Sequence, residues 1–364
     1  MNGLKIGENE QNMSYGAIQN SEGSSNHSVF NSKAHLNETP LENPLVKKFT
    51  DFDRKPILMK ISNYELSPDV ISIAKEYEKQ FQERNRFLWK FMGAVFQNTG
   101  ATLSTVDDQY KNSTTDIKIV FTILCAIFDD VADVYNDKEL ILKLKNIILQ
   151  PNDLSNEEGN EKIDLVKTLW KYVQDKMKKL PRYEEFIDIL MYDLKQMLNG
   201  FDYSCLVKEH PFLSNMTETE NYDCHNMMVF IFNGVDLMAS PKFKKEDLPH
   251  MRTAFWHAQK MARIGNWLST WKREIDEKDF GSGVFSYAFS KKIIEINEID
   301  DLSKEKIISR IENSDLYAHF AKDWYKNHEK LSSLKRYIKS IDMDRYVKGL
   351  EDVIQYHLAT DGLK

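Results

Sequence analysis

Two short polar clusters, far apart in the chain, carry the side chains best suited to chemistry. The first, residues 128–133, reads Phe-Asp-Asp-Val-Ala-Asp. Asp129 and Asp133 are four positions apart, so a helix places both carboxylates on one side of its last turn. With Asp130 beside them, three like charges would repel one another at the negative end of a helix dipole. Mg²⁺ would compensate this repulsion, because it binds a few carboxylates together with phosphate and water oxygens. The alternative is an ordinary solvated acidic helix end.

The second cluster, residues 266–274, reads Asn-Trp-Leu-Ser-Thr-Trp-Lys-Arg-Glu. Asn266, Thr270 and Glu274 recur every fourth position and form one stripe along two helical turns. Their amide, hydroxyl and carboxylate oxygens again suit Mg²⁺, and Arg273 could donate hydrogen bonds to a phosphate. A polar stripe on an amphipathic helix is the alternative. The flanking residues are largely apolar, however, so these polar groups would be partly buried and would need partners.

Long proline-free stretches indicate that helices must position both clusters. No proline lies between Pro68 and Pro151, and none follows Pro249. Ser67, Pro68 and Asp69 form a typical helix start, with an N-cap, a first-turn proline and an early acid. The spacing of apolar residues predicts helices over 115–134, 181–197 and 246–274, and turn and charge signals predict loops over 150–159, 209–219 and 276–283. Strand-like alternation is almost absent, so the expected fold class is all-α.

Composition bounds the domain organisation and the partners. Residues 1–45 are rich in Asn, Ser, Gly and Glu and are predicted to be a disordered tail, which leaves one α-helical domain over 46–364. The net charge of −7 offers no basic patch for nucleic acid. Three cysteines without metal-like spacing, no signal sequence and no apolar run of membrane-spanning length favour a cytoplasmic protein without a transmembrane segment. A homodimer is left open.

Taken together, the two clusters resemble the metal motifs of class I terpene synthases. Residues 129–133 are similar to the aspartate-rich motif DDxxD. Asn266, Thr270 and Glu274 are similar to the second motif, (N/D)Dxx(S/T)xxxE, with Arg273 where a basic residue is usual. The order and separation resemble the microbial-type single-domain cyclases over about residues 65–355. This resemblance implies a single helical bundle around a central apolar cavity.

The resemblance also implies an activity. The six oxygen ligands (Asp129, Asp130, Asp133, Asn266, Thr270 and Glu274) would hold three Mg²⁺ ions, with Mn²⁺ as a substitute, against the substrate diphosphate. The enzyme would ionise an acyclic isoprenyl diphosphate, cyclise the carbocation to a terpene hydrocarbon or alcohol, and release diphosphate. Aromatic faces can stabilise such a cation, and the candidates for this role are Phe121, Phe128, Trp89 and Phe96. Geranylgeranyl diphosphate is preferred over farnesyl diphosphate because small residues lie on candidate cavity helices, namely Gly93, Ala94, Ala126 and Gly234.

The chain departs from the family pattern in the basic groups that contact diphosphate. Residues 220–228, where the family usually has a diphosphate-sensing arginine, contain none. His225 or Asn226 could take that role, or a lysine or arginine could arrive from elsewhere. Arg345 and Tyr346 have the letters of the family's C-terminal Arg-Tyr pair. Because the following residues resemble the helix that usually precedes that pair, the favoured interpretation is that the pair is missing.

Three other functions remain open from the sequence. A trans-prenyl diphosphate synthase is also all-α and carries DDxxD, but it needs a second aspartate-rich motif where residues 266–274 stand. A cyclase initiated by protonation needs Asp-X-Asp-Asp, and the nearest string, residues 298–301, lacks the first aspartate. A non-catalytic helical binding protein derived from the fold would explain the absent arginine but not the intact metal ligands.

Overall fold

The computed structural model describes residues 49, 52–81, 84, 86–135, 137–150 and 160–363. The predicted all-α class is confirmed for this part of the chain, which contains no β-strand. The predicted tail over 1–45 lies outside the described residues. The α-helices, in chain order, are α2 (Arg54–Ser62), α3 (Pro68–Gln80), α4 (Arg86–Asn98), α5 (Lys111–Asp129), α6 (Lys138–Leu149), α7 (Glu161–Met177), α8 (Tyr183–Glu209), α9 (Met216–Asn221), α10 (Val229–Met238), α11 (Leu248–Glu277), α12 (Gly283–Ser290), α13 (Lys304–Glu312), α14 (Leu316–Ser333) and α15 (Met343–Ala359).

Shorter helical turns connect several of these helices. A π-helical turn, η2 (Asp130–Tyr135), continues α5. The 3₁₀ turns are η1 (Asp108–Tyr110), η3 (Pro211–Leu213), η4 (Asp223–Met227), η5 (Lys245–Asp247), η6 (Ile296–Glu298) and η7 (Leu334–Arg336). The two turns that matter most for the site are η2 and η4, because they lie beside the predicted metal motifs.

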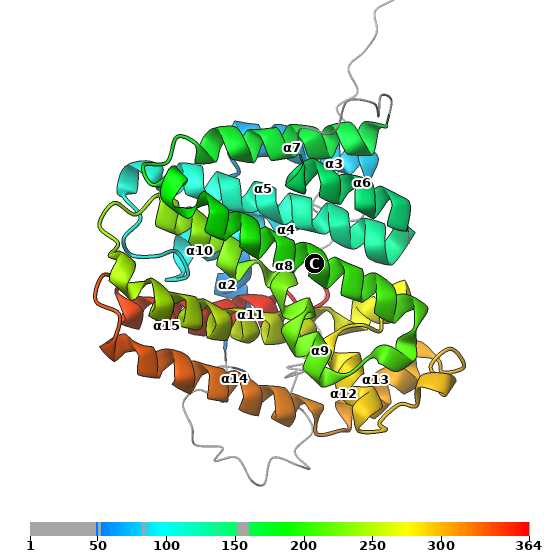
Figure 1. Ribbon diagram of the computed structural model, residues 1–364. Coiled ribbons are helices and arrows are strands. Elements are labelled where there is room, and N and C mark those ends of the chain that lie inside the picture. The colour runs from blue at the N-terminus through cyan, green and yellow to red at the C-terminus, as the bar shows by residue number, and fades with distance from the viewer. Residues whose placement is uncertain are drawn as a thin grey trace, which may run out of the picture.

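The helices pack as a bundle with α5 and α11 on opposite sides of its interior. Figure 1 shows α7, α3 and α6 along the upper side and α14 along the lower side, with α5, α4, α8 and α10 between them. Helix α5 packs against α3, α4, α7 and α10, whereas α11 packs against α10, α14 and α15. Helix α10 therefore touches both long helices, and the space between α5 and α11 is closed by α4, α10 and α15.

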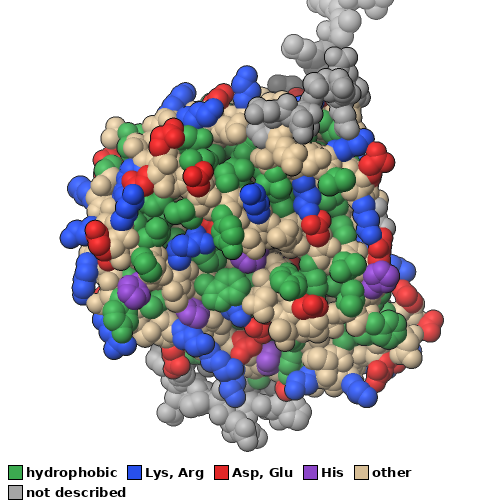
Figure 2. Space-filling model, in the orientation of Figure 1, with side chains coloured by type: hydrophobic (Ala, Val, Ile, Leu, Met, Phe, Trp, Pro, Cys, Tyr) green, Lys and Arg blue, Asp and Glu red, His purple; other side chains and the backbone are tan. Residues whose placement is uncertain are grey.

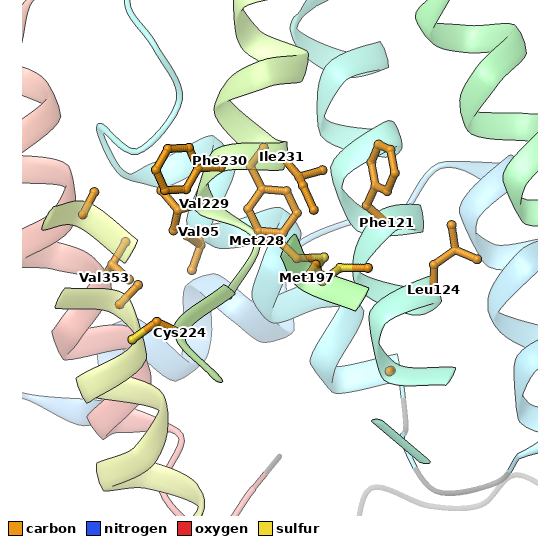
Figure 3. Packing of buried hydrophobic residues seen from close by; sticks show 14 of the residues in the cluster. Val95, Phe121, Leu124, Met197, Cys224, Met228, Val229, Phe230, Ile231 and Val353 are labelled. Atoms are coloured by element: carbon orange, nitrogen blue, oxygen red, sulfur yellow. The ribbon is translucent and has the colours of Figure 1, made fainter. Parts of the chain in front are cut away.

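The apolar character of α5 and α10 explains why they lie inside the bundle. Almost every residue of α5 from Ile117 to Phe128 is buried, and all residues of α10 are buried. A helix that is apolar on all faces can satisfy its surface only in the interior. Figure 3 shows side chains from α4, α5, α8, α10 and α15 meeting there, among them Val95, Phe121, Met197, Val229 and Val353.

Most predicted helices are present, but their ends differ from the prediction. The start at Ser67 is confirmed: its side chain accepts a hydrogen bond from Val70 N at 3.3 Å. Helix α8 runs well past 197, and α11 continues to Glu277, into the predicted loop over 276–283. Helix α9 begins inside the predicted loop over 209–219, where Asn215 caps it through Glu218 N. These polar segments were predicted as loops, but they form helical turns that local caps and packing stabilise.

Charges of both signs are mixed on the surface. On the face shown in Figure 2, basic and acidic side chains alternate around scattered apolar groups. Among the described helices, none is both long and apolar enough to cross a lipid bilayer.

Candidate functional site

Residues of both polar clusters line one cavity of ≈ 150 Å³. Asp129 comes from the end of α5 and Asp133 from η2, whereas Asn266, Thr270 and Glu274 come from α11. Helices α4 and α15 and the turn η4 complete the wall. The fold thus brings together two sequence segments that the chain separates by more than a hundred residues.

The π-helical turn sends the three aspartates of the first cluster in different directions. Asp129 and Asp133 line the cavity, but Asp130 does not. The Asp130 side chain is fully buried; its Oδ2 accepts a hydrogen bond from Tyr77 Oη at 2.5 Å, and its Oδ1 lies 3.3 Å from Arg84 Nε. Burial and the Asp130 charge raise the pKa of Tyr77, so the phenol stays protonated and donates. The structure therefore places Asp130 among the groups that hold Arg84, not among those that face the cavity.

The second cluster presents hard oxygen ligands in the order expected from its spacing. Thr270 Oγ1 donates to Glu274 Oε1 at 2.6 Å, and Asn266 Oδ1 accepts from Arg263 Nη1 at 2.7 Å. Glu274 is only 5% exposed, and its second oxygen, Oε2, has no hydrogen-bond partner within the described chain. Burial, followed by the nearby Asp279 charge, raises the pKa of Glu274 to about 8. A buried carboxylate oxygen without a partner is costly unless a ligand satisfies it.

The chemistry of these oxygen donors suits a divalent cation, although the described residues do not form a complete metal site. In the described chain, no three or more His, Cys, Asp or Glu side chains are already arranged to hold a metal ion. The cavity nevertheless carries more acids than bases, five against three. The five acids are Asp129, Asp133, Glu274, Glu277 and Asp279, and the three bases are Arg84, Arg263 and Arg273. Carboxylate, amide and hydroxyl oxygens with excess negative charge are the ligands that Mg²⁺ prefers.

Two arginines of the cavity wall, Arg84 and Arg263, were missed by the sequence analysis. Arg84 lies between α3 and α4 and pairs with Asp129 at 2.8 Å; the carboxylates around it raise its pKa despite its burial. Arg263 lies one helical turn before Asn266, and Asp223 of η4 accepts from its Nε at 2.8 Å. The spacing to Asn266 could have revealed Arg263, because residues three apart share a helix face. No local pattern marks Arg84, which reaches the site only through the fold.

Two acids, Glu277 and Asp279, were also missed because they follow the second motif. Glu277 lies 3.1 Å from Arg273 and 3.9 Å from Arg84, and so connects two guanidinium groups of the wall. Burial raises the pKa of Asp279 to about 6, and the charge of Asp129 adds to the rise. Turn and charge signals predict a loop here, whereas Glu277 is the last residue of α11.

An apolar chamber of ≈ 70 Å³ adjoins the polar cavity and shares part of its wall. Phe91 and Met92 of α4, Met227 of η4, Phe232 of α10 and His357 of α15 line both spaces. The chamber extends past Phe96, whose ring packs edge-to-face on Phe232 with 5.0 Å between centroids. One end of the combined space therefore carries oxygen ligands and guanidinium groups, and the other carries mainly hydrocarbon.

Only one of the four predicted aromatic candidates reaches this space. Phe96 lines the apolar chamber. Trp89 packs edge-to-face on Tyr77, Phe121 contacts Trp170, and Phe128 stacks on Phe201, so these three belong to the core around the cavity. Phe91 and Phe232, which no motif marked, take the lining positions instead.

Of the four small residues on which the preference for a longer substrate was based, likewise only one lines a cavity. Ala126 lines the polar cavity. Gly93 faces the Tyr64 ring, Gly234 faces Leu190, and Ala94 is fully buried without lining either space. Helix packing, not cavity width, is therefore what these three small side chains permit.

The remaining predicted donors divide between the cavity and other surroundings. Asn226 lines the polar cavity, whereas His225 does not: its Nδ1 lies 3.3 Å from Gln259 Nε2, and its ring lies beside Trp256. Tyr346 is buried and lines the apolar chamber, but Arg345 is exposed on α15. Consecutive residues of a helix point about 100° apart, and these two side chains accordingly do not line the same space.

In comparisons with known proteins, no protein-family model matches the chain, and no curated protein matches it significantly.

Proposed function

We propose that this chain is a class I terpene cyclase of the microbial single-domain type. It would ionise an acyclic isoprenyl diphosphate with Mg²⁺, cyclise the carbocation to a terpene hydrocarbon or alcohol, and release diphosphate. The observation that supports this proposal is a pair of adjoining cavities: residues of both polar clusters and three arginines line the first, and mainly apolar residues line the second.

The polar end is built to hold a divalent cation and a polyanion. Asp129, Asp133, Asn266, Thr270 and Glu274 would hold the cations, for which three Mg²⁺ are expected and Mn²⁺ is a substitute. When bound, Mg²⁺ supplies positive charge that neutralises the departing diphosphate. The three arginines of the wall can donate charge-assisted hydrogen bonds to the diphosphate oxygens, once they release the carboxylates with which they are now paired. Arg84 and Arg263 thus offer the donors that residues 220–228 lack.

The apolar end would hold the hydrocarbon and exclude water. A carbocation reacts rapidly with water, so the walls around it must offer few nucleophiles. Phe91, Phe96 and Phe232 present aromatic rings along this wall, and such rings attract a positive charge through their electron-rich faces. These residues would stabilise the cation without trapping it.

The length of the substrate depends on this chamber. We propose both geranylgeranyl and farnesyl diphosphate as substrates to be compared. The preference for the longer chain has lost most of its basis, because three of the four small residues behind it lie outside the cavity.

Product analysis tests this function. The full-length protein is incubated with farnesyl or geranylgeranyl diphosphate and Mg²⁺, and extracts are analysed by gas chromatography with mass spectrometry. We expect cyclic hydrocarbons or alcohols and stoichiometric release of diphosphate. Asp129→Ala and Glu274→Ala should nearly abolish turnover, whereas Asp276→Ala, an exposed acid on the same helix, serves as the matched control.

Other results would indicate other functions. Elongated isoprenyl diphosphates would identify a trans-prenyl diphosphate synthase, and binding of the diphosphates without any turnover would identify a helical binding protein. Near-normal activity of Asp129→Ala or Glu274→Ala would refute the assignment of the metal ligands.

A further inference from the structure

The wall of the apolar chamber contains one buried amide, that of Asn233, among its described residues. Asn233 belongs to α10, whose other residues are mostly apolar, and it is only 3% exposed. Burying an amide costs free energy unless its polar atoms are hydrogen-bonded. Each polar atom of Asn233 therefore calls for a partner, and the partners that it has and lacks indicate what the chamber can bind.

The hydrogen bonds of Asn233 fix the orientation of its amide. Nδ2 donates to Val229 O at 2.8 Å and to Tyr346 Oη at 3.3 Å. A backbone carbonyl oxygen only accepts hydrogen bonds, so the amide atom beside it must be the nitrogen. The other amide atom, Oδ1, is buried and has no hydrogen-bond partner within the described chain. Oδ1 is therefore the acceptor that Asn233 offers to a molecule in the chamber.

The hydroxyl of Tyr346 adds a donor next to this acceptor. Tyr346 comes from α15, lines the same chamber and is 1% exposed. Burial raises the pKa of Tyr346, so the hydroxyl keeps its proton at neutral pH. Because the hydroxyl oxygen accepts from Asn233 Nδ2, its own proton is free to point to another acceptor. Oδ1 and Nδ2 belong to one amide, so this donor and this acceptor lie close together.

A water molecule matches these two groups. Water can donate to Oδ1 and accept from the tyrosine hydroxyl, whereas a hydrocarbon can do neither. Buried waters bind polar groups that lack other partners, and a free volume of about 10–15 Å³ is enough for one. The apolar chamber has ≈ 70 Å³. The polar pair therefore forms a site for water on a wall that otherwise consists mainly of hydrocarbon.

We propose that Asn233 Oδ1 and Tyr346 Oη position the water molecule that ends the reaction, so that the product is a terpene alcohol. This inference rests on the proposed function and chooses between the two product classes that it leaves open. A lone pair of the water oxygen forms a C–O bond to the cationic carbon. One O–H bond of the water breaks, and its proton passes to the diphosphate released in the same turnover.

Each of the two side chains has a distinct role in this step. Asn233 accepts a hydrogen bond from the water and so stabilises the positive charge that develops on the water oxygen as the C–O bond forms. The Tyr346 hydroxyl donates to one lone pair and leaves the other lone pair for the carbon. Both are positioning residues for the water, and neither contacts the diphosphate.

Product analysis in labelled water tests this inference. The full-length protein is incubated with Mg²⁺ and farnesyl or geranylgeranyl diphosphate in water enriched in oxygen-18, and the products are analysed by gas chromatography with mass spectrometry. We expect the wild type to form mainly a labelled alcohol. Asn233→Leu removes the acceptor, and Tyr346→Phe removes only the hydroxyl. Each should lower the ratio of alcohol to hydrocarbon about 10-fold, with diphosphate release within about 3-fold of the wild type.

Tyr356→Phe is the matched control. Tyr356 is a buried tyrosine of the same helix, α15, but it does not line the chamber. Its variant loses the same hydroxyl group and should keep the product ratio of the wild type. Tyr346→Phe also keeps the test decisive if Asn233→Leu fails to fold, because the phenyl ring fills the same space.

The outcomes separate this inference from the proposed function. A labelled alcohol that declines in Asn233→Leu and Tyr346→Phe, but not in Tyr356→Phe, supports the inference. An unchanged product ratio in Tyr346→Phe overturns it, and so does a wild type that releases diphosphate but forms only hydrocarbons; the proposed function stands in both cases. If the wild type neither releases diphosphate nor forms a terpene, the proposed function itself fails and this inference fails with it.

Discussion

Asp130 and Asp129 are neighbours in one motif, yet the structure predicts opposite effects when each is neutralised. Asp130 is fully buried and bonded to Tyr77 and Arg84, whereas the Asp129 side chain is 38% exposed and lines the cavity. Replacing Asp130 by Asn removes one member of a buried ion pair, a change that costs about 3–5 kcal/mol. Because Arg84 would still be paired with Asp129 and Glu277, we expect the loss of stability to be at the lower end of this range, about 3 kcal/mol. This corresponds to a roughly 100-fold shift in the unfolding equilibrium.

Differential scanning calorimetry and urea unfolding in metal-free buffer measure this difference. For a chain of this size, about 3 kcal/mol lowers the melting temperature by roughly 4 °C. Asp129→Asn should change stability by less than about 0.5 kcal/mol, because it removes a partly exposed ion pair. Asp129→Asn should also weaken Mn²⁺ binding strongly. Asp130→Asn should weaken it only slightly, through a less ordered Arg84. An Asp130→Asn protein as stable as the wild type, or one whose Mn²⁺ affinity falls as far as that of Asp129→Asn, would refute the separation of roles.

Three further predictions concern the electrostatics and the shape of the cavity. The folded pKa values of Glu274 and Asp279, about 8 and about 6, lie above those of the unfolded chain, so the folded state holds protons that the unfolded chain has released. Metal-free stability should therefore fall by about 5 kcal/mol between pH 5 and pH 8, and calorimetry should find a smaller fall in Asp279→Asn. Arg263→Lys should keep the charge but lose the guanidinium hydrogen bonds, lowering kcat/KM about 10- to 100-fold in a diphosphate-release assay; unchanged kcat/KM would remove Arg263 from the site. Phe232→Leu should change the product ratio seen by gas chromatography, since this ring lines both spaces; an unaltered profile would show that the chamber does not shape the product.

The candidate ligands could be found in the sequence because their spacing repeats with the helix. Asp129 and Asp133, like Asn266 and Thr270, are four residues apart, and a helix must bring such residues to one face whatever surrounds it. The same local rules predicted the all-α class and the helix start at Ser67. They failed for Asp130, because a π-helical turn and two buried partners decide where that side chain points.

The rest of the site depends on contacts between segments that are distant in sequence. Arg84 and Asp279 line the cavity together with residues of α5 that are distant from them in sequence, and no short pattern encodes such a meeting. Which aromatic rings line the apolar chamber was likewise decided by packing: Phe91 and Phe232 face the space, while Phe128, equally apolar, stacks in the core. The sequence by itself determined most of the helices and the candidate oxygen ligands, since both follow from local periodicity. The tertiary structure decided which charges and rings surround those ligands, because that requires several helices to pack at once.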